Sequence, residues 1–145
     1  MKNHFKLPLL ALAMVTTLTA KADDTNIMGE DCAADSTCVA TVFQEFYNKI
    51  LPMPITKTIT LADFVVKPDI AVANVLLAQK KEDMLLAPGD ELALSQTLNA
   101  YADNLTCGVD QGIEQIYLKN GGQILWKYFF ADGTYFNTYA ISSCN

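Results

Sequence analysis

Residues that could carry out catalysis are scarce in this chain, and their scarcity restricts its function. The sequence contains one histidine, His4, and no arginine. Imidazole is the usual general base near neutral pH and a frequent metal ligand, and arginine is the usual partner of phosphate and carboxylate groups. His4 lies in a segment with the features of a secretory leader, so the mature chain would contain neither residue type. This composition disfavours a hydrolase or a phosphate-binding enzyme and favours a binding or interaction protein.

The remaining polar residues form no catalytic pattern. Asp90 and Glu91 suit a helix N-terminus, and Asp110 and Glu114 would share a helical face. Paired carboxylates can do acid–base work, as in glycosidases, but nothing near either pair indicates a raised pKa, and both are interpreted as surface acids. No calcium-binding loop is present. The serines lack a G-x-S-x-G elbow, an S-x-x-K spacing and a histidine base. We therefore expect no catalytic residues, no metal site and no cofactor.

Four cysteines follow the leader, and they predict two disulfides. An even number of cysteines behind a secretory leader is typical of disulfide bonding, whereas a four-thiolate metal site normally needs C-x-x-C pairs, which are absent. Four cysteines allow three pairings. We expect Cys107–Cys144, because Cys107 ends a predicted helix and Cys144 follows the predicted strand on which that helix packs. The remaining pair is Cys32–Cys38.

The first 22 residues are expected to be a signal peptide. Two lysines precede the apolar run 7–15, and Ala20-Lys21-Ala22 supplies small residues for cleavage, which predicts Asp23 as the first mature residue. No later apolar run reaches the ~20 residues needed to span a bilayer, and the residues before Cys32 are unlike a lipoprotein site. We expect a periplasmic or secreted bacterial protein without a membrane span.

The mature chain would be strongly acidic. Three of the ten lysines lie in the leader, so seven lysines would face sixteen carboxylates. Such a surface repels nucleic acid and anionic lipid headgroups. It suits either simple solubility or a basic partner. We therefore expect a protein partner and no nucleic acid. If the acidic surface serves binding rather than solubility, the partner is basic.

Hydrophobic periodicity predicts one α+β domain over residues 32–145, after a flexible acidic arm at 23–31. A helix capped by Asp35 or Ser36 runs to Ile50 and ends before Pro52. A second helix begins at residues 88–90 and ends at Cys107, and a short third helix covers 110–119.

Four strands are predicted, two between the first and second helices and two after the third helix. They cover residues 55–66, 70–78, 123–130 and 135–142, with a bulge near Ala62–Asp63 and a turn at Lys67-Pro68-Asp69. The second strand is nearly all apolar, which places it centrally. The resulting fold class is α+β, a four-stranded antiparallel sheet with helices on one face in the order α-β-β-α-(α)-β-β, with two disulfides.

The C-terminal hairpin carries the candidate binding residues. Asp132-Gly133 supplies the positive φ values of a tight turn. With a two-residue turn, one side of the hairpin would carry the pairs Phe130–Tyr135, Tyr128–Asn137, Trp126–Tyr139 and Ile124–Ile141. This aromatic side is either core or a recognition surface, since tryptophan and tyrosine concentrate at binding hot spots. Trp126 and Ile124 are expected in the core. Nearer the turn, where the hairpin would extend past the helices, we expect a protein-binding surface formed by Tyr128, Phe130, Asp132 and Tyr135.

The C-terminal forty residues also carry a resemblance to a known family. The arrangement consists of Cys107, Gly121-Gly122, the strand 124–130, Asp132-Gly133, the strand 135–141 and Cys144. It resembles the small secreted bacterial proteins known as quorum-sensing-regulated virulence factors. The resemblance implies an α/β sandwich fold and a secreted protein, and it brings no catalytic or binding residues.

Two functions from different classes agree with these features. The first is a secreted or periplasmic non-enzymatic interaction protein that serves virulence or the cell envelope. The alternative is an inhibitor or immunity-type protein that blocks a cationic enzyme, such as a lysozyme-like hydrolase. It would use its acidic surface or the Cys32–Cys38 loop, because a constrained loop loses less entropy on binding.

Overall fold

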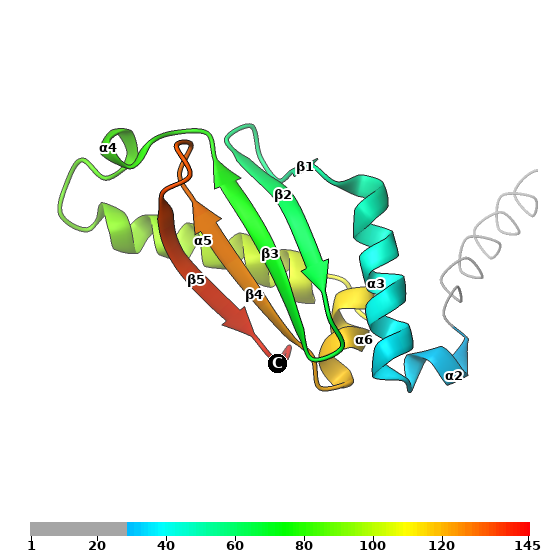
Figure 1. The fold of residues 1–145 in the computed structure, drawn as a ribbon. Coiled ribbons are helices and arrows are strands. Elements are labelled where there is room, and N and C mark those ends of the chain that lie inside the picture. Colours follow the sequence, from blue (N-terminus) through cyan, green and yellow to red (C-terminus); the bar gives the residue numbers. More distant parts are fainter. Residues whose placement is uncertain (1–28) are drawn as a thin grey trace, which may run out of the picture.

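The computed structural model describes residues 29–145 of the chain (Figure 1). The predicted signal peptide and most of the predicted arm lie outside the described residues. Residues 30 and 31, the end of the predicted flexible acidic arm, belong to helix α2 (Glu30–Ala33).

One five-stranded sheet lies at the centre of the described part, in the order β1-β2-β3-β4-β5. The strands are β1 (Met53–Pro54), β2 (Ile59–Val66), β3 (Ile70–Leu77), β4 (Gln123–Phe129) and β5 (Tyr135–Ile141). β3 and β4 are parallel, and the other neighbours are antiparallel. The α+β class is confirmed. The prediction of a four-stranded antiparallel sheet is wrong in two respects. The short edge strand β1 makes a fifth strand. The connection from β3 to β4 runs through helices and crosses the sheet, so these two strands are parallel.

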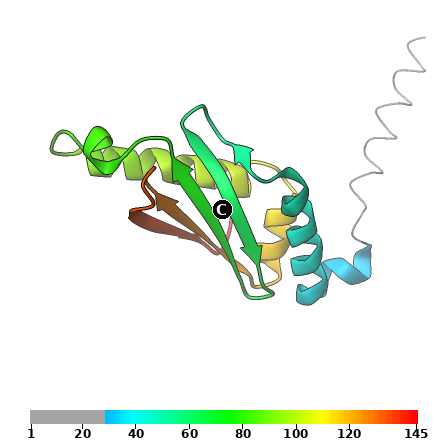
Figure 2. The same ribbon diagram turned by 45° about the horizontal axis from the view of Figure 1, so that its top comes forward.

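The helices cover one face of this sheet (Figures 1 and 2). They are α3 (Ser36–Ile50), α5 (Asp90–Cys107) and α6 (Ile113–Lys119), with a short α4 (Lys81–Met84) before α5. Asp35 caps α3, since its carboxylate accepts hydrogen bonds from the amides of Thr37 and Cys38 at 2.9 and 3.2 Å. The predicted start of this helix, with Asp35 as its N-cap, is therefore confirmed.

The core lies between the helices and the inner face of the sheet. On β4, the inward residues Ile124, Trp126 and Tyr128 alternate with partly exposed ones. Trp126 is 1% exposed, and its indole N–H donates to the hydroxyl of Thr106 on α5 at 3.1 Å. The core positions predicted for Trp126 and Ile124 are confirmed.

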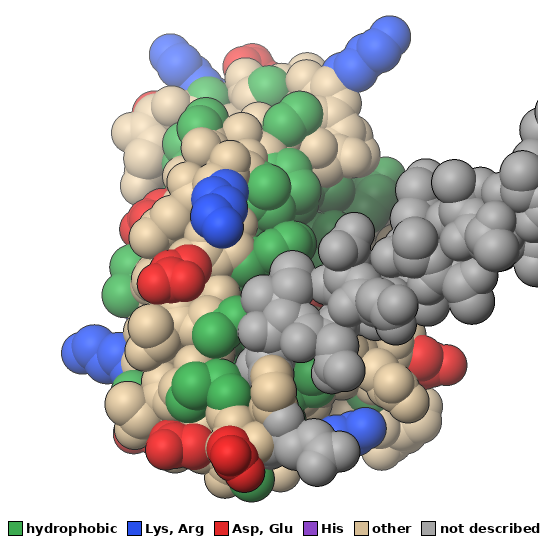
Figure 3. Space-filling model, turned by 90° about the vertical axis from the view of Figure 1, so that its right-hand side faces the viewer, with side chains coloured by type: hydrophobic (Ala, Val, Ile, Leu, Met, Phe, Trp, Pro, Cys, Tyr) green, Lys and Arg blue, Asp and Glu red, His purple; other side chains and the backbone are tan. Residues whose placement is uncertain are grey.

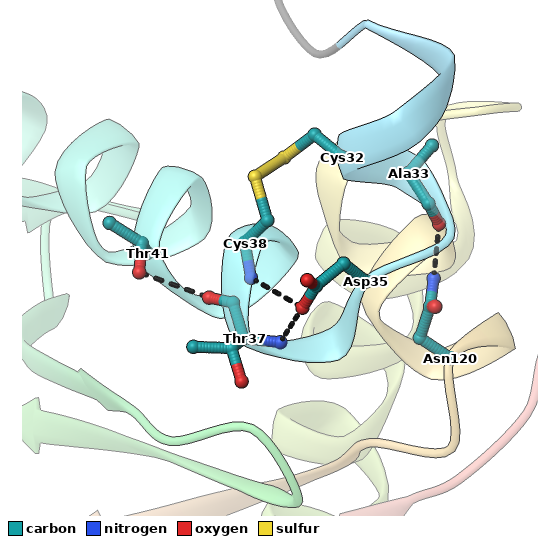
Figure 4. Close-up of a disulfide and its surroundings, with 7 residues drawn as sticks. All are labelled: Cys32, Ala33, Asp35, Thr37, Cys38, Thr41 and Asn120. Carbon is teal, nitrogen blue, oxygen red and sulfur yellow. Dashed lines mark hydrogen bonds between the residues drawn. A yellow bond between two sulfur atoms is a disulfide. The ribbon is translucent and has the colours of Figure 1, made fainter.

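Two disulfides connect the helices to their neighbours in the fold. Cys107 at the end of α5 pairs with Cys144 beyond β5, and Cys32 of α2 pairs with Cys38 in the first turn of α3 (Figure 4). The side-chain amide of Asn120 donates to the carbonyl of Ala33 at 2.8 Å, which ties the Cys32–Cys38 loop to the end of α6. Two disulfides are typical of a protein outside the cytoplasm.

No helix in the described range 29–145 has the length and apolar character required to cross a membrane.

Candidate protein-binding site

The hairpin end that the sequence predicts as a contact surface is only partly exposed. Tyr128 and Phe130 are each 1% exposed, so their predicted surface positions are wrong. The hydroxyl of Tyr128 lies 3.4 Å from the side-chain oxygen of Asn99 on α5, and the ring of Phe130 packs edge-on against Phe136. The reason is the length of α5. Its 18 residues extend about 27 Å, whereas the seven residues of β4 extend about 23 Å, so the helix can cover the full strand.

A bulge in the hairpin decides where Tyr135 points. Tyr128 lies opposite Asn137 as predicted, but the register then shifts and Phe129, not Phe130, lies opposite Tyr135. The predicted Phe130–Tyr135 pair is therefore wrong. The bulge turns Tyr135 away from the helices, where it is 54% exposed and its hydroxyl lies 2.8 Å from that of Thr138.

Asp132 lies at the exposed tip of the hairpin. Its carboxylate accepts a hydrogen bond from the amide of Thr134 at 3.0 Å, and hydrogen bonding to Thr134 lowers the pKa of this carboxyl. Of the four predicted contact residues, Asp132 and Tyr135 are thus on the surface, and a binding role for them stays a prediction.

The larger candidate surface is the side of the sheet that faces away from the helices, here called the open face (Figure 1). The strand register arranges its side chains in rows that cross the sheet. One apolar row contains Val65, Val72, Leu125 and Ala140, and a second contains Leu76, Phe129 and Tyr135. Val65 is 44% and Leu76 is 42% exposed. Exposed apolar side chains that gather on one face of a sheet make that face a candidate contact surface.

A polar row separates the two apolar rows. It contains Asp63, Asn74, Lys127 and Thr138, which are neighbours in the register of four strands. The side-chain amide of Asn74 donates to the carboxylate of Asp63 at 3.4 Å. The open face therefore combines apolar contact area with a central lysine and hydrogen-bonding groups that can orient a partner.

Sequence reasoning did not find Val65 and Leu76 as surface residues. It placed the apolar strand at 70–78 centrally, and β3 is indeed the third of five strands. A strand that is apolar on both sides is normally buried on both sides. The continuous apolar run, taken together with the predicted helices on one face, was therefore the signal for the open face, and the sequence reasoning did not combine the two.

The sequence reasoning placed Glu114 on the surface, but its carboxyl is partly buried. Its carboxylate accepts a 2.6 Å hydrogen bond from the hydroxyl of Tyr47, and burial raises the pKa of Glu114. Its partner is a tyrosine of the protein itself, so this contact joins α3 to α6. Among residues 29–145, no group of three or more His, Cys, Asp or Glu side chains is placed to hold a metal ion.

The side of the molecule that carries α3 shows a different distribution. Apolar side chains lie there between lysine and acidic side chains, so charges of both signs occur on this side (Figure 3). Phe46 and Ile50 of α3 are 46% and 38% exposed. Figure 3 shows charges of both signs on this side, so its visible part has no single-sign patch that would select a charged partner.

The fold is shared with two proteins of bacterial secretion. EpsS, the pilotin of the type 2 secretion system of Vibrio vulnificus, aligns with 13% identity over 78% of this chain and 93% of its own, at a TM-score of 0.52. AspS, the type II secretion system pilotin of Vibrio cholerae, aligns with 12% identity over 77% of this chain and 93% of its own, also at 0.52. At these identities the likeness shows the fold alone.

No family model matches the chain, and no curated protein matches its sequence. Its resemblance to quorum-sensing-regulated virulence factors therefore stays a prediction.

Proposed function

We propose that this chain is a non-enzymatic protein of the periplasm or extracellular space that binds a protein partner on the open face of its sheet. The observation that carries the proposal is the unequal covering of the sheet. Helices bury one face, while the other exposes Val65, Leu76 and Tyr135 on three different strands. Apolar area distributed in this way suits a protein surface better than a small molecule, which normally occupies a concave pocket.

The setting of this partner is the secretion apparatus or the cell envelope. The chain has the same fold as two pilotins of type II secretion systems, which supports a role as an accessory protein of secretion. Its two disulfides agree with a location outside the cytoplasm. A contribution to virulence would follow from such a role in a pathogen.

The test compares two leucine substitutions in a pull-down from envelope extracts and culture supernatants. Leu76→Asp places a charge on the open face, and Leu92→Asp makes the same change at a position of α5 that is 64% exposed. We expect the wild type and Leu92→Asp to retain one partner in common and Leu76→Asp to lose it. Equal capture by all three proteins would contradict the proposal. Capture of a cationic hydrolase at low salt, lost at high salt, would support the inhibitor instead.

A further inference from the structure

The two edges of the sheet differ in how well they are protected against pairing with a further strand. At one edge, β1 has two residues and ends in Pro54. Beyond it, the side chain of Gln44 on α3 donates to the carbonyl of Phe64 and accepts from the amide of Val66, both at 2.7 Å. These are the hydrogen bonds that a neighbouring strand would make with β2. A short strand with a proline and a side-chain cap closes this edge to further pairing.

The β5 edge has outward-pointing backbone groups. In β4, the amide of Gln123 donates to the carbonyl of Asp69 on the β3 side. Backbone groups of successive residues point to opposite sides of a strand, so the even-numbered residues of β4 bond to β5. Their register partners are residues 137, 139 and 141. The N–H and C=O groups of Thr138 and Ala140 therefore point away from the sheet.

Apart from the bulge near Tyr135, β5 has none of the usual devices that protect an edge. Its sequence, Tyr135–Ile141, contains no proline, no glycine and no charged residue. It is seven residues long, and the described part of the chain places no strand or helix beyond it (Figure 1). A long uncharged edge is a template for an added strand.

A polar hollow lies next to this edge. It has a volume of about 420 Å³ and is lined by Asp103 and Cys107 of α5 and by residues 139–145. Asp103 accepts a hydrogen bond from the hydroxyl of Tyr139 at 2.9 Å. The lining contains a carboxylate, hydroxyl groups and an amide, and it contains no lysine. Its charge is complementary to that of a lysine or arginine side chain.

The same charge argues against a second copy of this chain as the occupant. Two β5 strands paired across a two-fold axis would bring a second Asp103 toward the first. Like charges brought together at an interface disfavour the pairing.

We propose that the free edge of β5 accepts an extended segment of a partner protein as a sixth strand, and that a basic side chain of this segment enters the hollow at Asp103. The segment pairs with the backbone of Thr138 and Ala140, and the hollow selects its charge. This site shares Thr138 and Ala140 with the open face, but it uses their outward backbone groups, whereas the open face presents their side chains.

The probe is a synthetic nine-residue peptide of alternating threonine and valine with a lysine at its centre, and a matched peptide carries glutamate there. The readout is amide hydrogen exchange measured by NMR on the disulfide-bonded mature protein. The lysine peptide should slow exchange at Thr138 and Ala140 by at least about tenfold, because a paired strand protects both amides. The glutamate peptide should bind at least about tenfold more weakly. Asp103→Asn should remove most of that difference.

Three further variants make the outcome decisive. Ala140→Pro removes only an outward amide, which an edge strand tolerates, and it should prevent binding, whereas Ala140→Ser keeps the amide and should bind normally. Leu76→Asp, on the open face, should leave the protection unchanged. The proposal is wrong if the lysine peptide leaves exchange at Thr138 and Ala140 unchanged, or if the two peptides bind equally. Protection that grows with protein concentration without peptide, together with a sedimenting dimer, would instead assign the edge to a second copy.

Discussion

The hydroxyl of Tyr47 donates a hydrogen bond of 2.6 Å to the carboxylate of Glu114, and this contact joins α3 to α6. Burial raises the pKa of Glu114, and the hydrogen bond from Tyr47 opposes part of that effect. Burial and the nearby Glu114 also raise the pKa of Tyr47, so the hydroxyl keeps its proton and remains the donor. Sequence reasoning treated Glu114 as a solvated acid, because periodicity alone does not show that α3 packs across the exposed side of a seven-residue helix.

The pH dependence of stability should reveal this pair. A raised pKa means that the folded protein retains a proton on Glu114 that the unfolded chain releases near pH 4.5. The contribution of Glu114 to the free energy of unfolding is therefore highest below about pH 4.5, and it falls as the pH rises from there through the pKa of the folded state. Glu114→Gln stays neutral and keeps an oxygen for Tyr47, so it should lack this fall.

Urea unfolding of both proteins between pH 4 and pH 8 measures the effect. The wild type should lose stability relative to Glu114→Gln as the pH rises. Glu45→Gln, at an exposed position of α3, is the comparison for loss of one negative charge. A difference between wild type and Glu114→Gln that does not change with pH would show that the carboxyl is not perturbed by burial.

Trp126 and Thr106 should be structural. Trp126→Ala removes a fully buried side chain and should cost about 3–5 kcal/mol of stability. Thr106→Val keeps the volume but leaves the indole N–H without its partner, and should cost about 1–3 kcal/mol. Trp126 is the single tryptophan, so its fluorescence can follow urea unfolding of the wild type and of Thr106→Val, and far-ultraviolet circular dichroism can follow Trp126→Ala. An emission maximum typical of an exposed indole in the native protein would contradict this assignment.

The local elements of the fold could be predicted because their signals are local. The Asp35 cap, the bulge between Leu61 and Asp63 and the start of α5 near Asp90 each depend on a few adjacent residues. The direction of β4 relative to β3 could not be predicted in the same way. It depends on how the chain crosses the sheet between residues 77 and 123, and no local pattern encodes that path.

The candidate site was harder to predict than the fold. The sequence identified the hairpin correctly but placed Phe130 and Tyr135 as a pair, because a two-residue turn implies that register. The register shift between Tyr128 and Phe129 turns Tyr135 toward the open face, whereas Phe130 continues the inward alternation of β4 and is buried. A shift of one residue moves a side chain to the opposite face of a sheet, so an error of one position in the turn changes the whole contact surface.

The two disulfides should contribute unequally to stability. Cys107–Cys144 has a sequence separation of 37 residues and Cys32–Cys38 one of 6. Chain entropy predicts roughly 3–4 kcal/mol for the larger loop and about 2 kcal/mol for the smaller. Replacing both cysteines of each pair by alanine and measuring thermal unfolding tests this order. A larger loss from the Cys32–Cys38 replacement would mean that the hydrogen bond from Asn120 to that loop depends on its disulfide.

Tyr128 and Tyr135 provide a matched pair for the hairpin, since both are tyrosines near its turn but they face opposite sides. Tyr128 is 1% exposed, and its environment raises the pKa of its hydroxyl, chiefly through burial. Tyr128→Ala should therefore lower stability by about 3–5 kcal/mol, as expected for a large buried side chain. Tyr135 is 54% exposed on the open face, so Tyr135→Ala should change stability by no more than about 0.5 kcal/mol. Thermal unfolding followed by circular dichroism separates the two variants, and the pull-down described above then measures partner capture for Tyr135→Ala.

For Tyr135→Ala we expect weaker capture of the partner without loss of folding, because an exposed tyrosine supplies contact area at low entropic cost. If Tyr135→Ala unfolds the protein, the ring is part of the core and the open face is not the binding surface.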